Sequence, residues 1–378
     1  MSMQNTAQKF TEELQAISDL AKSFASRELI AKREENDHYP FGELFTETIK
    51  NAKNVGFYGV NLPAEYGGIG MGDSALASIL ENLSIADASM SGIIFTSAAA
   101  IEIINQASRE TDCSVVYKML STKEALPVAF PSFTGIGEME MPVADKKGEI
   151  SGRINFLCLG GISRYAVLPA GESTCGSKIS YYLLDLNEHG IEKSEPVYSL
   201  GLHACPGVDV FLENVPATLI GVAGEGEKYF QAMQSHLSLG AAAVSLGILK
   251  GSFMEALQYT KDRFQGGRQI IDWSEVRMIL ANMAIEIQVG QSCLASACSE
   301  LDAGVAGWEK TARAVAIHVA EMASRATVDG IQLLGGNGYM KDYGQEKRMR
   351  DANQAQCFLG MDPVRKMDLI NRIIKENQ

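Results

Sequence analysis

The chain has 378 residues, 46% of them hydrophobic and 21% charged, and its formal net charge is −13. A chain of this length can bury a large apolar core in two or three layers. The excess of acidic side chains argues against nucleic acid or an anionic membrane surface as the main partner. These numbers are typical of a globular protein and leave the fold open.

Seven cysteines and five histidines are scattered along the chain without a Cys-x-x-Cys pair. Their spacing predicts neither a disulfide framework nor a metal site. The polar amino terminus lacks the apolar segment of a signal peptide, and no uninterrupted apolar run reaches the length that spans a membrane. We therefore expect a cytoplasmic protein without a membrane partner.

Helical periodicity dominates the first third of the chain. Apolar residues recur at three- and four-residue steps from Thr11 to Glu35, and further helices are predicted at Leu44–Ala52, Ser74–Ala86 and Ser89–Gln106. Between them, the segment GFYGVNLPAEYGGIGMGD is rich in glycine and predicts a loop. The sequence thus indicates an all-α domain over residues 1–125.

Short apolar or alternating segments replace the helices after Pro127. They cover residues 154–159, 165–169, 179–184 and 208–212, with Gly, Asp, Asn and Ser between them. This pattern predicts a small β-domain over residues 126–222. No helical stretch of ten residues interrupts it, which excludes the βαβ units of a Rossmann domain.

Long helices are predicted again in residues 223–378, at about 228–261, 274–302, 308–334 and 362–375. Each is long enough for a four-helix bundle. The third ends at the segment IQLLGGNGYMKDYGQEKRMRD, which begins at Ile331. Its pair Gly335 and Gly336 allows the backbone to end a helix and to bring N–H groups close to a phosphate or a ribose.

Four segments, taken together, resemble the acyl-CoA dehydrogenase family. Residues Gln332 to Ala352 are similar to the family's Q-x-x-G-G-x-G-Y/F and E-x-x-x-R-D-A motifs. The segments GFYGVNLPAEYGGIGMGD, SLGLHACPGVDVFLENVPA and YTKDRFQGGRQI resemble three further family motifs in the same order. The resemblance implies an α+β fold with an N-terminal helical domain, a middle small β-barrel or sandwich, and a C-terminal four-helix bundle.

The resemblance also implies a flavoprotein oxidoreductase that acts on acyl thioesters. In the family a glutamate removes the α-proton of the substrate while a hydride passes to FAD. The position of this glutamate corresponds to Leu359, and leucine cannot accept a proton. His236, where other members carry the glutamate, and Asp362 are substitute candidates. A structural role is more common for such a histidine, and Asp362 also fits a helix N-cap before Pro363.

Most positions that serve a family member's own cofactor and substrate carry unusual residue types here. These positions are Cys158, Leu159, His203, Cys205, Gly207, Ser235 and Ser238. Cys and Leu offer a flavin little hydrogen bonding, and Ser235 and Ser238 stand where an acid and an arginine contact CoA in the family. Ser132 and Phe156 are retained and remain candidates for cofactor binding.

A second set of residues matches the family. It comprises Arg263, Gln265, Gln332, Gly335 and Gly336. In the family these residues reach across the subunit interface to the neighbour's FAD, and a planar, permanently charged guanidinium suits a pyrophosphate. The chain therefore keeps residues that serve a neighbour and has lost most of those that serve itself.

Three interpretations follow. In the first, the chain is the base-deficient subunit of a heteromeric dehydrogenase and supports FAD held by a homologous partner subunit. In the second, it is an active flavoenzyme, a homodimer or homotetramer, with another base, a carrier-protein thioester or a substrate that needs no α-proton abstraction. In the third, it is a flavin-free binding or structural protein. The resemblance also implies an electron-transfer flavoprotein as a redox partner.

Overall fold

The computed structural model describes residues 3–38, 46–122, 124–173 and 178–376, with side chains from residue 12 onward. Its first part is helical, as the apolar periodicity predicts. Helix α1 (Met3–Phe24) continues through a π-turn (Ala25–Leu29) and a 3-10 turn (Ile30–Lys32) into α2 (Arg33–Asn36). The remaining helices of this part are α3 (Thr46–Asn54), α4 (Gly72–Ala86), α5 (Ala88–Ser108) and α6 (Ser114–Leu120). The predicted helix start at Leu44 lies outside the described residues.

The middle part is a seven-stranded sheet with the strand order β5-β6-β2-β1-β3-β4-β7. Its strands are β1 (Val143–Ala144), β2 (Glu149–Cys158), β3 (Tyr165–Glu172), β4 (Ile179–Asp185), β5 (Ile191–Lys193), β6 (Gly207–Pro216) and β7 (Thr218–Ile220). All neighbours in it are antiparallel except β1 and β3. The register of β2 against β6 shifts between Ile154 and Leu157, and such a bulge re-aims the side chains around it.

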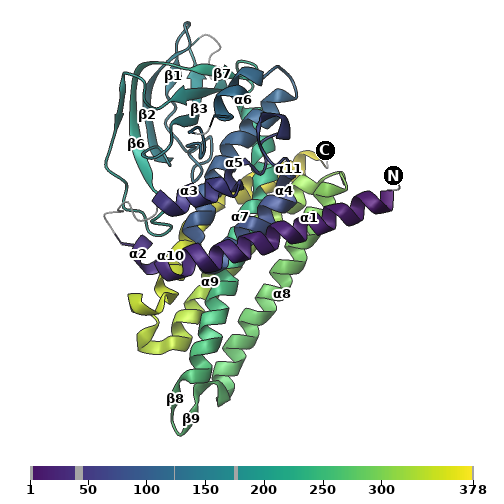
Figure 1. Ribbon diagram of the computed structural model, residues 1–378, viewed down its shortest axis with the longest axis vertical. Helices are drawn as coiled ribbons and strands as arrows, with labels where there is room; N and C mark the ends of the chain where they lie inside the picture. The colour runs from purple at the N-terminus through teal and green to yellow at the C-terminus, as the bar shows by residue number, and fades with distance from the viewer. Residues whose placement is uncertain (1–2, 39–45, 123, 174–177, 377–378) are drawn as a thin grey trace.

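The last part consists of long helices that extend away from the sheet (Figure 1). Helix α7 (Gly226–Asp262) leads through the hairpin strands β8 (Phe264–Gln265) and β9 (Arg268–Gln269) into α8 (Ser274–Asp302). Helix α9 (Trp308–Leu334), α10 (Gln345–Ala355) and α11 (Asp362–Glu376) complete the chain. The four predicted long helices are confirmed within two residues at each end. The hairpin and the sheet lie at opposite ends of the molecule (Figure 1).

Helices α5 and α7 contribute many of the buried apolar residues of the core and pack against each other and against α4 and α9. By length and composition alone, α5, α7 and α8 could each cross a membrane, although the sequence contains no uninterrupted apolar run of that length. The apolar windows of α5 and α7 are 94% and 83% buried, whereas that of α8 is only 22% buried. Helix α8 therefore presents an apolar face at the surface, with Met278, Ile285 and Val289 exposed.

Buried ion pairs on α10 join the three parts of the chain. Lys347 is 4% exposed, and its Nζ contacts Asp87 Oδ1 at 3.0 Å and Asp351 Oδ2 at 2.6 Å. Arg350 Nη2 donates to Asp37 Oδ2 at 2.5 Å, and His203 Nδ1 lies 3.0 Å from Asp37 Oδ1. The basic run that follows the glycine pair therefore fixes α10 against the end of α2 and the sheet domain.

Candidate functional site

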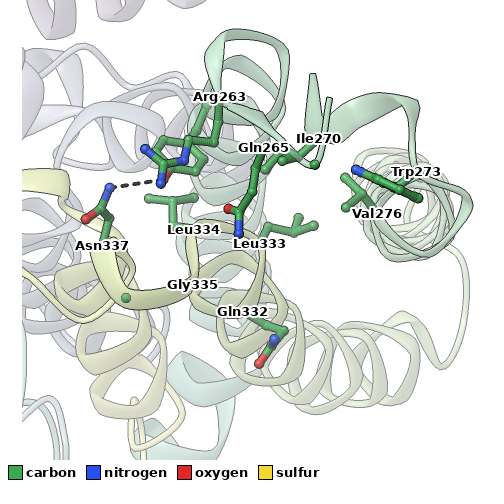
Figure 2. Close-up of a pocket in the computed structure, with 13 residues that line it drawn as sticks. Arg263, Gln265, Ile270, Trp273, Val276, Gln332, Leu333, Leu334, Gly335 and Asn337 are labelled. Carbon is green, nitrogen blue, oxygen red and sulfur yellow. Dashed lines mark hydrogen bonds between the residues drawn. The ribbon is translucent and has the colours of Figure 1, made fainter. Parts of the chain in front are cut away.

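Five of the predicted cofactor-binding residues line one cavity of about 640 Å³ at the hairpin end of the molecule. Arg263 follows α7, Gln265 belongs to β8, and the other three, Gln332, Gly335 and Gly336, come from the end of α9. Figure 2 shows Arg263 and Gln265 on one side of the cavity and the end of α9 on the other. The structure thus brings together residues that are up to 73 positions apart in the sequence, from 263 to 336.

The backbone explains why these residues meet. Helix α7 ends at Asp262 because Arg263 adopts an extended conformation, and a tight turn through Gly266 and Gly267, both with positive φ, reverses the chain. Gly335 has a φ of 57° and ends α9. A Cβ at Gly335 or Gly336 would meet no atom within 4 Å. The glycine pair therefore leaves space beside its backbone for a ligand, while the Gly335 N–H already donates to the Gln332 carbonyl.

The cavity has a basic and amide-rich side and an aromatic side. Arg263 is exposed, and no carboxylate of the described residues forms an ion pair with it. Asn337 Nδ2 donates to Tyr259 Oη at 3.0 Å beside it (Figure 2). Trp273 lies at the far wall of the cavity (Figure 2). An unpaired guanidinium next to a glycine turn without side chains is suited to a diphosphate. The Trp273 ring is covered on one face by the guanidinium of Arg268, 4.2 Å from its centroid.

Sequence analysis did not anticipate Tyr259, Trp273 and Asn337 as parts of this cavity. Tyr259 and Asn337 stand within two of the recognised motifs. Their proximity in the sequence to Arg263 and Gly336 was therefore the signal that could have identified them. Trp273 lies between a hairpin and a helix, and no pattern in the sequence indicates that its side chain faces the cavity.

The two other retained residues, Ser132 and Phe156, lie far from this cavity, next to the sheet. Ser132 is fully buried, and its Oγ lies 2.8 Å from Thr96 Oγ1 in a hydrogen bond. Its carbonyl oxygen accepts a hydrogen bond of 2.8 Å from the N–H of Leu359. The structure therefore places Ser132 beside Leu359, but the Ser132 hydroxyl is already engaged within the protein.

Aromatic rings fill the space around Ser132. Phe133 contacts the ring of Phe156 at a centroid distance of 5.6 Å and stacks on Phe358 at 4.7 Å. Phe358 also contacts Phe95 at 4.2 Å. Because Phe95, Phe133 and Phe358 are buried, this interior region is packed with protein side chains.

A pair of thiols borders the same region. Cys158 Sγ and Cys205 Sγ lie 3.6 Å apart, and both residues are buried. Burial opposes ionisation of Cys158, but hydrogen bonds from Cys205 and the hydroxyls of Ser132 and Thr96 outweigh it and lower its pKa. Burial raises the pKa of the Cys205 thiol. The residue types that replace the family's flavin contacts are thus satisfied by one another.

Four large residues next to this region have left-handed backbones. Phe156, Leu159, Leu202 and Leu359 have φ values of 52°, 64°, 51° and 64°. Such a conformation costs an L-residue roughly 1–2 kcal/mol, and strained residues gather at functional sites. Four strained residues therefore lie within one region around the Leu359 loop.

Neither substitute base candidate occupies the position of Leu359. The Nδ1–H of His236 donates a 2.5 Å hydrogen bond to Asp73 Oδ2, and the ring lies against Trp308 at a centroid distance of 4.9 Å. Burial disfavours the charged ring, but the bond to Asp73 outweighs this and raises the pKa of His236. Leu359 instead contacts Gln234, whose Nε2 donates to the Leu359 carbonyl at 3.0 Å. Asp362 is the first residue of α11 and forms an ion pair with Lys366 at 2.8 Å.

Comparison with known proteins agrees with this architecture. A family model described as the N-terminal domain of acyl-CoA dehydrogenase matches residues 11–122, and one described as its C-terminal domain matches residues 224–374. The chain is 28% identical over 380 residues to a 3-(aryl)acrylate reductase of Clostridium sporogenes, which covers 97% of this chain and 100% of that protein. It is 24% identical to the caffeyl-CoA reductase–Etf complex subunit CarC of Acetobacterium woodii, over 97% of this chain and 100% of that protein.

The fold is also that of solved acyl-CoA dehydrogenases. The enzyme from Geobacillus kaustophilus superposes with a TM-score of 0.85 at 21% identity, over 96% of this chain and 98% of that one. An FAD complex of PigA superposes with a TM-score of 0.84 at 19% identity, over 97% and 98%. FAD is the usual cofactor of these proteins. With both family domains matched and the full-length fold shared, the chain belongs to the acyl-CoA dehydrogenase family.

Proposed function

We propose that this chain is the base-deficient subunit of a heteromeric, FAD-dependent acyl-thioester dehydrogenase or reductase, and that it completes the FAD site of a homologous partner subunit. One contrast carries the proposal. The five retained residues of the hairpin end line an open surface cavity, whereas the interior positions around Ser132 and Leu359 are buried under aromatic rings.

The residues of the cavity fit the phosphate end of FAD. Arg263 would place its charge against the diphosphate, and the glycine pair, which has no side chains, would let the same group approach the backbone closely. The interior side does not fit the flavin ring, since Cys158, Cys205 and Ser132 bond to one another and to Thr96. When bound, FAD would accept a hydride. This chain would hold and orient the cofactor while the partner supplies the base.

The exposed face of α8 supports the presence of a partner. Met278, Ile285 and Val289 are 63%, 60% and 42% exposed and stand about one or two helical turns apart. The cavity residue Val276 belongs to the same helix. A subunit docked on α8 would bury this apolar face and close the cavity.

Further partners are part of the same proposal. The similarity to a subunit of an Etf complex supports an electron-transfer flavoprotein as the redox partner. The proposed compartment is the cytoplasm, because the spacing of the cysteines predicts no disulfide framework.

A second candidate is a flavoenzyme that holds its own FAD and reduces or oxidises an acyl compound with another acid or base. The carboxylate of Glu138 favours it. Glu138 Oε1 accepts a hydrogen bond of 2.9 Å from the N–H of Met361, two residues from Leu359. Both Glu138 oxygens, however, accept hydrogen bonds from the backbone N–H groups of Met361 and Gly135. This arrangement suits a carboxylate that holds two loops together better than one that removes a proton.

The test compares visible absorption spectra of the purified chain alone and after co-expression with a glutamate-bearing acyl-CoA dehydrogenase encoded near it. The proposal predicts a colourless lone chain and a yellow, active complex. Arg263→Gln should lower the flavin content of the complex at least tenfold, whereas Arg27→Gln, at an exposed position of the π-turn after α1, should leave it unchanged. A stoichiometric flavin spectrum for the lone chain, bleached by an acyl thioester, would favour the second candidate. A chain that forms no complex and binds no flavin would support a flavin-free binding role.

A further inference from the structure

Two buried cysteines meet where the sheet domain packs on α5. Cys158 is the last residue of β2, and Cys205 lies in the loop before β6. Their Sγ atoms are 3.6 Å apart, and the residues are 0% and 2% exposed. Gly92 of α5 leaves room for the pair, since a Cβ there would lie 3.1 Å from Cys205 Sγ. The cysteines are 47 positions apart in the sequence, so the fold brings the two thiols together.

The backbone on both sides of the pair is held by hydrogen bonds. Cys158 pairs with Gly207 in the antiparallel register of β2 and β6. The N–H of Leu159 donates to the Pro206 carbonyl at 2.8 Å. A disulfide bond is about 2.0 Å long, so the sulfur atoms need to approach by only about 1.6 Å. Because folding has already brought the two segments together, bridging Cys158 to Cys205 costs little further chain entropy.

The surroundings make Cys158 the more reactive sulfur of the two. Burial opposes its ionisation, but hydrogen bonds from Cys205 and from the hydroxyls of Ser132 and Thr96 outweigh this and lower the pKa of Cys158. Burial and the neighbouring Cys158 raise the pKa of the Cys205 thiol. The thiolate is the nucleophile when a thiol is oxidised, so the pair has one attacking sulfur and one thiol that can resolve the product.

We propose that Cys158 and Cys205 form a reversible disulfide when the protein encounters hydrogen peroxide. The Cys158 thiolate attacks one oxygen of the peroxide, the O–O bond breaks, and Cys158 becomes a sulfenic acid. The hydroxide that leaves takes up the proton released by the Cys158 thiol. The Cys205 sulfur then attacks the sulfenic sulfur, the S–S bond forms, and the sulfenic oxygen leaves as water with the Cys205 proton. Two thiols are oxidised, and one peroxide is reduced to two water molecules.

Burial of the pair and a reducing compartment are both compatible with this reaction. Hydrogen peroxide is scarcely larger than water and can reach buried thiols when the structure opens locally. Disulfides in cytoplasmic proteins, where they occur, are usually transient and sense the redox state. The bridge is therefore a response to oxidant and not a permanent part of the fold.

The bridge would strengthen the junction between the sheet domain and the helices. The loop that contains Cys205 also contains Leu202, whose N–H donates to Asp351 on α10, and His203, whose ring contacts Asp37 after α2. A covalent bond from Cys205 to β2 fastens this loop to the sheet. Oxidation should therefore slow the local opening that exposes the loop, and hydrogen exchange at Leu202 should slow about tenfold.

The experiment uses the full chain and hydrogen peroxide. Iodoacetamide first blocks the accessible thiols of the native protein, which is then oxidised, unfolded in N-ethylmaleimide and mapped by mass spectrometry. The proposal predicts that Cys158 and Cys205 lose their free thiols together and appear in one bridged peptide, which dithiothreitol separates. Cys113 is also buried, and burial raises its pKa, so it should remain reduced as an internal control.

Two variants separate the roles of the cysteines. In Cys205→Ser the reaction should stop at a sulfenic acid on Cys158, which dimedone traps. In Cys158→Ser the Cys205 thiol should remain reduced, and its oxidation there would overturn the assignment of Cys158 as the attacking sulfur. Cys113→Ser is the matched control and should form the bridge at the rate of the wild type.

The wild type alone can overturn the proposal, whether or not the variants fold. A pair that stays reduced while Cys113 reacts, oxidation of Cys158 without a bridge, or bridges that join other cysteines equally often would each do so. All these readouts are made without flavin or an acyl thioester, so they remain separate from the test of the proposed function.

Discussion

The backbone N–H of Leu202 donates a hydrogen bond of 2.7 Å to Asp351 Oδ1. Leu202 lies in the loop before β6, and Asp351 lies on α10, so the bond crosses from the sheet domain to the helical part. The second oxygen of Asp351 pairs with Lys347, which also reaches Asp87 at the start of α5. One carboxylate thus connects all three parts of the chain.

Removal of the Lys347 charge should destabilise the protein strongly. Lys347→Met leaves Asp87 and Asp351 buried without a cation, and we expect a loss of about 3–5 kcal/mol in the free energy of unfolding. Urea denaturation followed by circular dichroism measures it. Lys366→Met removes an exposed lysine and should produce no measurable change. A loss for Lys347→Met no larger than that for the control would contradict the structural role of α10.

The stability of the protein should fall as the pH rises past neutrality. Burial disfavours charge on His203, but its bonds to Asp37 outweigh this and raise its pKa above the ordinary 6.5. The folded state therefore holds the proton to a higher pH than the unfolded chain. This stabilisation is complete below about pH 6.5 and is lost as the pH rises through the folded value. His236 has a raised pKa and contributes a loss of the same sign.

Urea midpoints measured between pH 5.5 and 9 test this dependence. His203→Gln should flatten the decline without removing it, since His236 remains. His318→Gln, at an exposed position, should follow the wild type. A wild-type decline that persists unchanged in His203→Gln would show that the His203–Asp37 pair is not its source.

Replacement of Leu359 should reverse the usual order of stability, in which an alanine variant is more stable than a glycine variant. Both substitutions remove a buried side chain, which costs about 2–5 kcal/mol. At a φ of 64°, alanine retains the strain and glycine releases it, so Leu359→Gly should be at least as stable as Leu359→Ala. At Leu80, within α4, the glycine variant should instead be about 1 kcal/mol less stable than the alanine variant. If the alanine variant is the more stable one at both Leu359 and Leu80, Leu359 does not have a left-handed backbone.

The exposed apolar face of α8 should be required for assembly. Ile285→Arg places a charge where the proposed partner docks, so the complex should dissociate while the isolated chain keeps its fold. Ser121→Arg makes the same charge change at an exposed position on another part of the surface and should leave assembly intact. Analytical ultracentrifugation measures both variants. Unchanged assembly of Ile285→Arg would exclude α8 from the interface.

The long elements follow directly from the sequence. Periodic apolar positions predict α7, α8, α9 and α11, and the β-pattern predicts β2, β3, β4 and β6. The short strands β1, β5 and β7 have two or three residues each and carry too little pattern to be recognised. Helix α10 was visible as a helix-forming basic run, but its buried ion pairs depend on tertiary contacts.

The candidate residues differ in how far the sequence could place them. The motifs correctly grouped Arg263 and Gln265 with Gly335 and Gly336, because a motif preserves positions in space. They could not show that His236 faces Asp73, since the direction of a helical side chain depends on the packing of α7 against α4 and α5.

The cavity at the β8–β9 hairpin and the packed region around Ser132 lie at opposite ends of α7. Arg263 directly follows its last residue, whereas Gln234, near its start, bonds to Leu359 beside Ser132. Substitutions at sites so far apart, with no shared neighbours, change stability additively. The change in stability caused by a mutation at one end therefore does not depend on mutations at the other end. Over evolutionary time, a duplicated subunit with this layout is free to lose its own interior chemistry while selection continues to preserve the surface that a neighbouring chain needs.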